Sequence, residues 1–331
     1  MNRRNAAALL LALLLALTLS VPALALEADS LVPMGAAVGI RLETDGVMVA
    51  GLAEVETAEG AVRPAEAAGL QVGDVVKTLD GRKTDSAAAF LSAAAAMTGA
   101  PVELTAERDG ALLRFTVQPA RSPQGTWQLG LWLRDGVSGI GTVTFYDPAS
   151  GTFGALGHGV NDLDTGALLP FADGTITETR VVDVVRGAAG SPGELCGDSA
   201  QGAALGALSK NTPSGIFGAA EWTEAGEPVP VAGEEETALG PATIRCCVEG
   251  DEVRDYQVEI SRIYRGAEDH RFLMLTVTDE ALLRTTGGIV QGMSGSPILQ
   301  NGKLVGAVTH VLINDPTRGY GISIQDMLSA A

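Results

Sequence analysis

Short apolar runs separated by turn residues dominate the chain from about residue 126 onward. Four examples are TETRVVDVVRG, DYQVEISRIYR, RFLMLTVTD and KLVGAVTHVLIN. Runs of this length, bounded by glycine, proline, asparagine or aspartate, are typical of β-strands, and their regular recurrence favours a barrel or a sandwich. Strands and helices do not alternate here as they do in a parallel sheet. The pattern therefore predicts a mainly β domain.

The chain between residues 31 and 119 combines short apolar runs with an alanine-rich stretch, residues 86–97, that favours a helix. Its middle part, RPAEAAGLQVGDVVKTLDGRKTDS, contains a helix start, a Gly-Leu pair, a Gly-Asp pair and a strand in that order. This order resembles that of a PDZ domain. The alternative is a small β domain whose glycines serve only hairpin turns. We expect a PDZ domain over residues 31–119.

The start of this region, VPMGAAVGIRL, lies where a PDZ domain has its carboxylate-binding loop and the edge strand that follows it. Backbone N–H groups of such a loop hold the C-terminus of a peptide, and the edge strand takes up the peptide as one more strand. The resemblance implies that Met34, Gly35, Gly39 and Ile40 bind peptide C-termini.

The N-terminus has the pattern of an export signal. Arg3 and Arg4 precede an uncharged apolar run over residues 6–21 and the small-residue sequence ALA at residues 23–25. A charged start, an apolar middle and a small-residue cleavage site define a secretory signal. The alternative is an uncleaved membrane anchor, because the apolar run is just long enough to span a bilayer. We expect residues 1–25 to be a signal peptide or an anchor, and the rest of the chain to be exported.

The composition argues against two classes of partner and against a metal. The 331 residues include 40 acidic and 22 basic ones, which gives a formal net charge of -18. A surface with this excess of negative charge repels nucleic acids and anionic lipids. The cysteines, Cys196, Cys246 and Cys247, form no Cys-x-x-Cys pair and have no histidine nearby. The sequence therefore predicts neither a zinc site nor another cofactor.

Glycines surround one serine in the segment QGMSGSPILQNGKLVGAVTH, residues 291–310. A serine hydroxyl is a weak nucleophile, so it needs a base that takes its proton and backbone N–H groups that stabilise the oxyanion. We expect Ser294 to be the nucleophile, with the N–H groups of Gly292 and Ser294 as the oxyanion hole. The loop resembles the Gly-x-Ser-Gly-x-Pro loop of chymotrypsin-like proteases, which a hairpin and a Val-Gly strand follow, as in NGKLVGAVTH.

Two other assignments of the nucleophile fit less well. The elbow of α/β-hydrolases has the order Gly-x-Ser-x-Gly, whereas Ser296 takes the last position here. That fold also needs an acid and a histidine downstream of the nucleophile on a parallel sheet. Ser296 itself is followed by Pro297, which has no backbone N–H to offer.

Three histidines are candidates for the general base. His158 ends a predicted strand in GALGHGV, far before Ser294, so base and nucleophile would come from the two halves of a double barrel. His270 lies in the polar turn GAEDHR, where we expect it to be solvated. His310 follows the nucleophile loop in a strand, and either lines the cleft near the substrate pocket or is a strand histidine without a role.

The order of these motifs resembles the SpoIVB peptidase family of endospore-forming bacteria. The resemblance rests on GIGTVTFYDPASGTFGALGHGVND, on GGIVQGMSGSPILQNGKLVGAVTHVLINDPTRGYGI and on the PDZ domain ahead of them. It implies a chymotrypsin-like double β-barrel over residues 120–331, with Ser294 as nucleophile and His158 as base.

The resemblance also implies an acidic partner for the histidine. The family has this residue shortly before the serine, where Asp279 stands in LTVTDEALL. Chymotrypsin-like enzymes normally carry it on the first barrel, and Asp162, Asp164 and Asp183 are the alternatives there. The chemistry requires only a carboxylate that accepts the histidine Nδ1–H and stabilises the imidazolium.

The family resemblance implies an exported serine endopeptidase of sporulation signalling, without a metal or cofactor. Such an enzyme acts in the space between the inner and outer forespore membranes. It cleaves itself and a membrane-bound regulator of an intramembrane protease, which triggers sigma-K processing. Two alternatives stay open: a catalytically silent PDZ scaffold, and an HtrA-like quality-control protease of the envelope. HtrA-type proteases place the PDZ domain after the catalytic domain, and the intact Ser294 and His158 argue against a silent scaffold.

Overall fold

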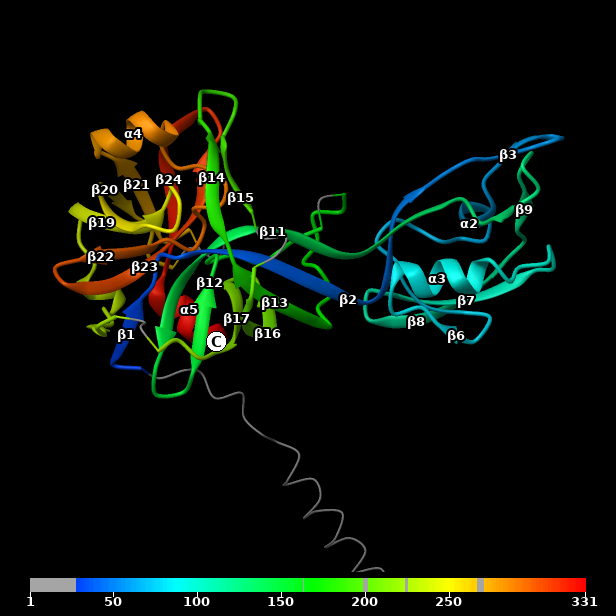
Figure 1. Ribbon diagram of the computed structural model, residues 1–331, viewed down its shortest axis with the longest axis horizontal. Coiled ribbons are helices and arrows are strands. Elements are labelled where there is room, and N and C mark those ends of the chain that lie inside the picture. Colours follow the sequence, from blue (N-terminus) through cyan, green and yellow to red (C-terminus); the bar gives the residue numbers. More distant parts are fainter. Residues whose placement is uncertain (1–27, 163, 199–201, 224–225, 267–270) are drawn as a thin grey trace, which may run out of the picture.

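The computed structural model describes residues 28–162, 164–198, 202–223, 226–266 and 271–331. The signal or anchor expected over residues 1–25 lies outside these residues, as does His270. Within the described part, no helix combines the length and the apolar composition needed to cross a bilayer. Figure 1 shows a larger and a smaller lobe, connected by the long strands β2 (Ala37–Leu52) and β11 (Leu131–Asp147).

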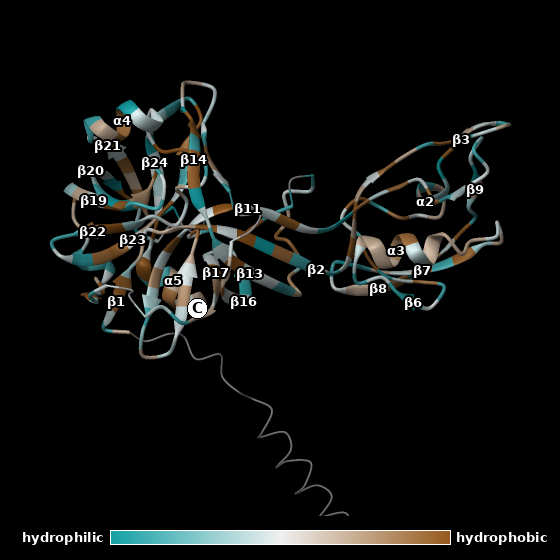
Figure 2. Cartoon of the chain, in the orientation of Figure 1, coloured by the Kyte–Doolittle hydropathy of each residue, from teal (hydrophilic) through white to brown (hydrophobic). Residues whose placement is uncertain are grey.

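Six of the described strands form a first barrel in the larger lobe. In the order β2, β11, β12, β17, β16 and β13, each strand pairs antiparallel with the next, and β13 pairs back with β2. Along β2 the buried Ile40 and Leu42 alternate with the exposed Arg41 and Glu43, because side chains of a strand point to opposite faces. Figure 2 shows this alternation as bands of colour. The other strands are β12 (Thr152–Ala155), β13 (Asp173–Glu178), β16 (Ala204–Thr212) and β17 (Gly215–Ala220).

A second barrel closes in the same way from six further strands of the described chain. The order is β19, β20, β21, β24, β23 and β22, and β22 pairs back with β19. Its interior is apolar, with Ile244, Ile260 and Ile298 fully buried in one cluster. The elements are β19 (Gly240–Cys247), β20 (Val253–Ile263), β21 (Leu273–Val277), α4 (Glu280–Thr286), β22 (Pro297–Gln300), β23 (Lys303–Leu312), β24 (Asp315–Ser323) and α5 (Ile324–Ala330).

The smaller lobe has the helix and strand order expected from the sequence pattern. The helix α3 (Ala87–Ala94) begins at Ser86, whose side chain accepts a hydrogen bond from the Ala89 N–H as an N-cap. Phe90 of this helix is buried in one apolar cluster with Leu104 of β7. The other elements are β3 (Val55–Thr57), β4 (Gly60–Val62), α2 (Pro64–Ala67), β5 (Val75–Leu79), β6 (Arg82–Lys83), β7 (Val102–Arg108), β8 (Ala111–Val117), β9 (Ala120–Arg121) and β10 (Trp127–Gln128).

This PDZ-like region is an insertion in the first barrel, not a domain that precedes it. Residues 37–43 of β2 pair with β11 inside the barrel, whereas residues 48–52 of the same strand pair with the start of β11 in the smaller lobe. The expected division into residues 31–119 and 120–331 therefore differs from the strand pairing, since the first half of β2 belongs to the barrel. A continuous strand contains no local signal for such a boundary.

The strand β1 (Ser30–Pro33) ties the two barrels together. It pairs with β11 of the first barrel and with β18 (Val229–Pro230). Leu31 is fully buried in a cluster with Leu304 and Ile322 of the second barrel. The remaining elements are β14 (Arg180–Val185), β15 (Glu194–Asp198) and the 3-10 helix η1 (Glu234–Glu236).

The predicted fold class is confirmed. The chain is mainly β, with a PDZ-like region and two six-stranded barrels that are consistent with the chymotrypsin-like fold. The two barrels lie side by side in the larger lobe, and the interface between them is where the predicted base and nucleophile meet.

Candidate active site

The nucleophile loop, residues 287–296, connects α4 to β22. Gly292 and Gly295 have φ angles of +94° and +96°, in the left-handed region that glycine favours. At Gly295 a side chain is also excluded by space, since a Cβ would lie 2.0 Å from the Thr142 carbonyl oxygen and 2.5 Å from Leu156 N. These glycines let the loop turn tightly and press against the first barrel.

The two serines of this loop have different surroundings. Ser294 is half-buried, and its Oγ–H donates a hydrogen bond of 2.6 Å to the Thr309 carbonyl of β23. Ser296 is fully buried, and its hydroxyl donates to the Met293 carbonyl at 2.7 Å. Ser294 is therefore the accessible hydroxyl, while Ser296 braces the loop from within.

In the turn around the serine, residues 291–296, the backbone N–H groups of Gly292 and Ser294 have no acceptor among the residues that the structure describes. The N–H groups beside them are occupied: Gly295 N donates to the Val308 carbonyl, and Met293 N also has a backbone acceptor. Backbone donors are seldom left unpaired in folded proteins. This pair is available to an acceptor from outside the chain.

The histidine loop, residues 156–162 and 164–169, follows β12 and carries His158 to the barrel interface. Leu156 has a φ angle of +69°, and a left-handed conformation costs a leucine about 1–2 kcal/mol. Next to it, a Cβ on Gly157 would lie 2.9 Å from Ile322 Cγ2 and 3.1 Å from Thr309 Cγ2. The loop therefore packs directly on β23 and β24 of the second barrel.

His158 and His310 meet at this interface. Their ring centroids are 5.0 Å apart, with an angle of 37° between the ring planes. His310 follows Thr309, whose carbonyl accepts the Ser294 hydroxyl. The structure thus brings together the predicted base, the predicted nucleophile and the predicted substrate-pocket residue. Among the described residues no hydrogen bond joins Ser294 to His158, because the hydroxyl is turned toward Thr309.

Strand β11 contacts both loops. The Thr142 N–H donates to the Ser294 carbonyl at 2.9 Å, and Thr142 Oγ1 donates to the Gly292 carbonyl at 2.9 Å. The Leu156 N–H in turn donates to the Thr142 carbonyl at 3.2 Å. One residue of the first barrel therefore holds the base and nucleophile loops in register.

The His158 ring is half-buried and has a defined tautomer. Its Nδ1 lies 2.9 Å from the Gly159 carbonyl oxygen, which can only accept a hydrogen bond. The neutral ring therefore carries its hydrogen on Nδ1, and Nε2 is the basic nitrogen. Burial lowers the pKa of the His158 imidazole, and the hydrogen bond with Gly159 acts in the opposite direction. At neutral pH the ring is uncharged and can take up a proton.

Asp279 is not bound to His158. Its Oδ1 accepts the N–H groups of Ala281 and Leu282 at 2.9 and 3.0 Å, as the N-cap of α4. Its Oδ2 accepts the Gln257 N–H at 3.3 Å. The carboxylate of Asp279 therefore caps α4, and His158 Nδ1 contacts the Gly159 carbonyl instead. The role of Asp279 as the triad acid stays a prediction.

The three alternative carboxylates do not bind the histidine either. Asp162 and Asp164 bind Arg134, at 2.6 and 3.0 Å. Asp183 accepts the N–H of the next residue in β14. Within the described part of the chain, a backbone carbonyl takes the position of the acid.

The residues predicted to bind a peptide lie at or inside the first barrel. Gly39 and Ile40 pair with β11 on one side of β2 and with β13 on the other. The N–H groups of Met34 and Gly35 donate to carbonyls of β11. A strand that is paired on both sides has no edge for a peptide. The predicted peptide-binding role of these four residues is therefore corrected.

A second segment in which a glycine precedes an apolar strand is LGLWLRD, residues 129–135. It was not identified from the sequence pattern. Residues 131–134 of β11 pair only with β2 among the described strands. Helix α3 lies beside this stretch, where the Ala87 N–H donates to Asp135 Oδ2 at 2.8 Å. The signal that could have identified it is a glycine between two apolar residues directly before a strand, with Gly130 at a φ angle of +71°.

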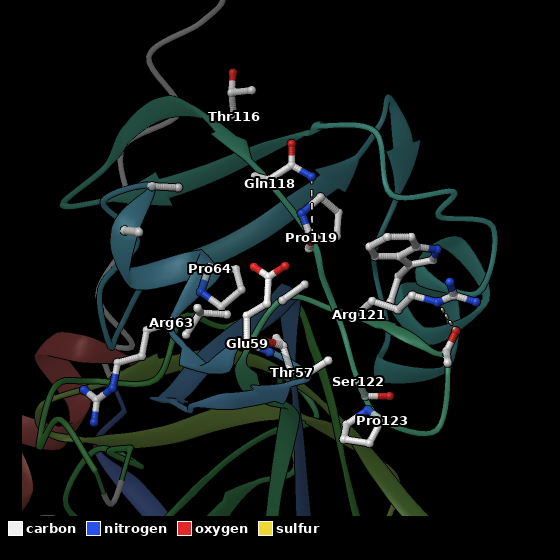
Figure 3. Close-up of a pocket in the computed structure, with 17 residues that line it drawn as sticks. Thr57, Glu59, Arg63, Pro64, Thr116, Gln118, Pro119, Arg121, Ser122 and Pro123 are labelled. Atoms are coloured by element: carbon white, nitrogen blue, oxygen red, sulfur yellow. Dashed lines mark hydrogen bonds between the residues drawn. The ribbon is translucent and has the colours of Figure 1, made fainter.

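A cavity of about 950 Å³ lies in the smaller lobe, between α2, the end of β8 and the hairpins β3–β4 and β9–β10. Figure 3 shows Pro64, Gln118 and Pro119 around it. All of its lining residues belong to the smaller lobe, so it is separate from the site at Ser294. Within the described residues, no group of histidine, cysteine and acidic side chains could hold a metal ion.

The chain is similar to the PDZ domain of the SdrC-like protein from Listeria monocytogenes, with 21% sequence identity and a TM-score of 0.22, over 27% of this chain and 87% of that chain. No curated protein matches the chain. A family model, SpoIVB peptidase S55, matches residues 125–328, which include His158 and Ser294. Because this match covers more than half of the sequence, the chain belongs to the SpoIVB peptidase S55 family.

Proposed function

We propose that this chain is an exported serine endopeptidase in which Ser294 is the nucleophile and His158 is the base. The family implies a serine peptidase, and one observation carries the assignment of residues. The nucleophile loop and the histidine loop come from different barrels and are in direct contact at Gly295 and Leu156. The N–H groups of Gly292 and Ser294 are the proposed oxyanion hole, supported by their lack of an acceptor among the described residues.

In the proposed reaction, Ser294 Oγ attacks the carbonyl carbon of a peptide bond while its proton passes to Nε2 of His158. The oxyanion that forms accepts hydrogen bonds from the two free N–H groups, which are already in place because Thr142 braces their loop. His158 then gives the proton to the leaving amine, and an acyl ester remains on Ser294. A water molecule attacks this ester in the same way and releases the second product.

The Ser294 hydroxyl must leave the Thr309 carbonyl before it can react. Rotation about the Cα–Cβ bond turns it away from that carbonyl, and hydrogen bonds of this kind are often formed only when substrate binds. The Thr309 carbonyl then becomes available to a substrate N–H. The exposed ring of His310, next in the strand, is proposed to border the substrate pocket.

The proposed base works without a bound carboxylate. The Gly159 carbonyl fixes the orientation of the His158 ring, but it carries no full negative charge. It therefore stabilises the imidazolium less than an aspartate would. We therefore expect a slow peptidase. A role in sporulation signalling, in turn, implies few substrates.

The proposed partners follow from the family and from the free stretch of β11. Residues 131–134 offer backbone groups to an extended peptide beside α3, so we place the binding of peptide C-termini there. The proposed substrates are the chain itself and a membrane-bound regulator of an intramembrane protease, and their cleavage would trigger sigma-K processing. The proposed location is the space between the inner and outer forespore membranes, with the chain either released or attached through its N-terminus.

The test compares residues 27–331 as wild type with the Ser294→Ala and His158→Ala variants. Self-cleavage is followed on a gel, and a fluorophosphonate probe reports a reactive serine. We expect the wild type alone to trim itself and take the label. If the wild type and Ser294→Ala behave alike, the chain is a silent scaffold and the proposal fails.

A further inference from the structure

Arg134 lies where strand β11 passes from the smaller lobe into the first barrel. Its guanidinium binds two carboxylates of the histidine loop: Nη1 is 2.6 Å from Asp162 Oδ2, and Nη2 is 3.0 Å from Asp164 Oδ2. The side chain of Asp162 is only 1% exposed. Removing the partner of a buried charge leaves that charge uncompensated, so this pair is costly to break.

Asp162 sets the shape of the histidine loop. Its Oδ1 accepts the N–H groups of Asp164 and Thr165 at 3.1 and 2.9 Å and the Thr165 hydroxyl at 3.0 Å. Its own N–H donates to the Ala167 carbonyl at 2.9 Å. Burial acts to raise the pKa of Asp162, but the donors from Thr165 and Asp164 and the charge of Arg134 outweigh it and lower the pKa. Asp162 is therefore an ionised anchor for the loop.

The loop has a second anchor on the barrel wall. The Asn211 side chain of β16 accepts the Val160 N–H at 2.9 Å and donates to the Val160 and Leu169 carbonyls at 2.9 and 3.1 Å. His158 lies two residues before Val160 and four before Asp162. The backbone near His158 is thus held by two strands, β16 through Asn211 and β11 through Arg134. Strand β11 also runs into the smaller lobe.

A turn of the smaller lobe also lies close to the histidine loop. A Cβ on Gly73, in the turn before β5, would lie 3.5 Å from Thr165 Cγ2. Residues 131–134, which end with Arg134, form the stretch of β11 proposed to receive a peptide. A peptide bound there would act on the strand that holds Asp162.

We propose that Arg134 is a positioning residue that couples the smaller lobe to the base. Its ion pair with Asp162 fastens the histidine loop to the peptide-binding strand, so peptide binding and proton transfer at His158 are linked. This inference rests on the proposed function of His158 and names the contact through which the PDZ-like region acts on it.

The test compares two ion pairs of the same kind. Arg108 binds Asp74 at 2.6 Å, and the two side chains are 24% and 1% exposed, against 30% and 1% for Arg134 and Asp162. The Arg108 pair lies within the smaller lobe. Wild-type, Arg134→Met, Arg134→Lys and Arg108→Met chains are compared by hydrogen exchange over residues 158–169, by fluorophosphonate labelling of Ser294 and by kcat and KM on a peptide substrate.

We expect Arg134→Met to speed up exchange in the histidine loop and to lower the labelling rate and kcat by about 10- to 100-fold at nearly constant KM, because small displacements of a catalytic group have effects of this size. Arg134→Lys keeps the charge and should restore most of the rate. Arg108→Met should leave both exchange in the loop and labelling unchanged. The inference is overturned if the loop exchanges as in the wild type, or if Arg108→Met has the same effects.

Arg134→Met alone leaves the buried Asp162 charge without a partner and could misfold. The double variant Arg134→Met/Asp162→Asn avoids this, because it removes both charges. We expect it to fold and to show the same fast exchange in the loop. If the wild type shows no labelling that depends on Ser294, the proposed function is rejected. The hydrogen-exchange rates of the histidine loop would then be the test of whether Arg134 positions that loop. Fast exchange limited to the Arg134 variants supports it, and equal exchange in all variants overturns it.

Discussion

The two barrels have the same closed six-stranded topology but hold their catalytic loops in different ways. The nucleophile loop of the second barrel is fixed by its backbone, through close contact at Gly295 and hydrogen bonds to Thr142. The histidine loop of the first barrel is held mainly by two side chains, Asn211 and Arg134. Backbone contacts leave no room for adjustment, whereas side-chain contacts can be made and broken. We therefore expect the far part of the histidine loop, residues 160–162 and 164–169, to depend more on side-chain contacts than the nucleophile loop does.

The largest effect should come from a side chain at the tightest backbone contact. In Gly295→Ala, the Cβ would meet the Thr142 carbonyl at 2.0 Å, at a φ angle of +96°. We expect a loss of about 3 kcal/mol or more in the free energy of unfolding and no probe labelling. Urea unfolding and fluorophosphonate labelling measure the two quantities.

Gly302→Ala is the matched control. Gly302 has a φ angle of +76°, but a Cβ there meets nothing within 4 Å. It should cost only about 1 kcal/mol and leave labelling intact. Equal losses in the two variants would mean that backbone strain alone, and not close contact between the barrels, explains the Gly295 result.

Asn211→Ala tests the side-chain anchor of the first barrel. The variant removes three hydrogen bonds to Val160 and Leu169. It leaves the Val160 N–H and the Leu169 carbonyl without partners, whereas the Val160 carbonyl keeps the Leu169 N–H. We expect a loss of about 2 kcal/mol and slower labelling, with urea unfolding and label kinetics as the measurements. Gln118→Ala, which removes amide contacts in the smaller lobe, should leave labelling unchanged. Labelling at the wild-type rate in Asn211→Ala would show that the anchor does not position the base.

The Asp279→Ala variant distinguishes two possible roles of this residue, the N-cap of α4 and the catalytic acid. As the N-cap of α4, Asp279 should contribute about 1 kcal/mol to stability, and Asp279→Ser should restore it. Labelling should stay close to the wild-type rate in both variants. A loss of about 10⁴-fold, as expected for a triad acid, would contradict the cap assignment and would require a rearrangement that brings Asp279 to His158.

The smallest expected effect is the pH dependence of His158. Burial lowers the pKa of this ring below the value of 6.5 that it has in the unfolded chain. As the pH falls below 6.5, the unfolded chain therefore binds a proton before the folded chain does, and the free energy of unfolding decreases. Urea unfolding at pH 7.5 and 5.5 should show this decrease in the wild type, and His158→Gln should reduce it. The labelling rate should fall with an apparent pKa below 6.5, and a rate that falls already above pH 6.5 would contradict the buried, neutral base.

The strands and the nucleophile loop could be predicted because their signals are local. Period-two alternation identifies β2, and GMSGSP contains the glycines that the turn at Ser294 requires. The position of His158 just after a strand could be predicted for the same reason, since GALGHGV ends an apolar run with glycines and β12 ends at Ala155.

The strand pairing could not be predicted, because it depends on contacts between distant segments. VGIRL at residues 38–42 and LWLRD at residues 131–135 are both short, mainly apolar segments that begin within a few residues after a turn glycine, Gly35 and Gly130. Nothing within either segment says which one lies in the barrel and which has an open side next to α3. The sequence therefore did not reveal that Gly39 and Ile40 are paired on both sides inside the barrel.

The position of the acid poses a different problem. An aspartate directly before EALLRTT has the pattern of a helix N-cap, so the structural role of Asp279 was visible in the sequence. The family resemblance favoured a chemical role at the same position. The hydrogen bonds show that the carboxylate is occupied by the backbone of α4 and by Gln257.

The insertion of the smaller lobe into the first barrel also bears on how the chain folds. To close the barrel, β2 must find β11 across a loop of about 80 residues, which costs about 2 kcal/mol more than closing a loop of about five. Once the smaller lobe has folded, residues 48–52 and 131–134 are already paired, so the remaining halves of the two strands can zip together as neighbours. The barrel then forms on a template, and the base and nucleophile loops, which both bind β11 at Thr142, come together after it. We therefore expect the PDZ-like region to fold first, and a chain whose smaller lobe is unfolded to lack a closed first barrel.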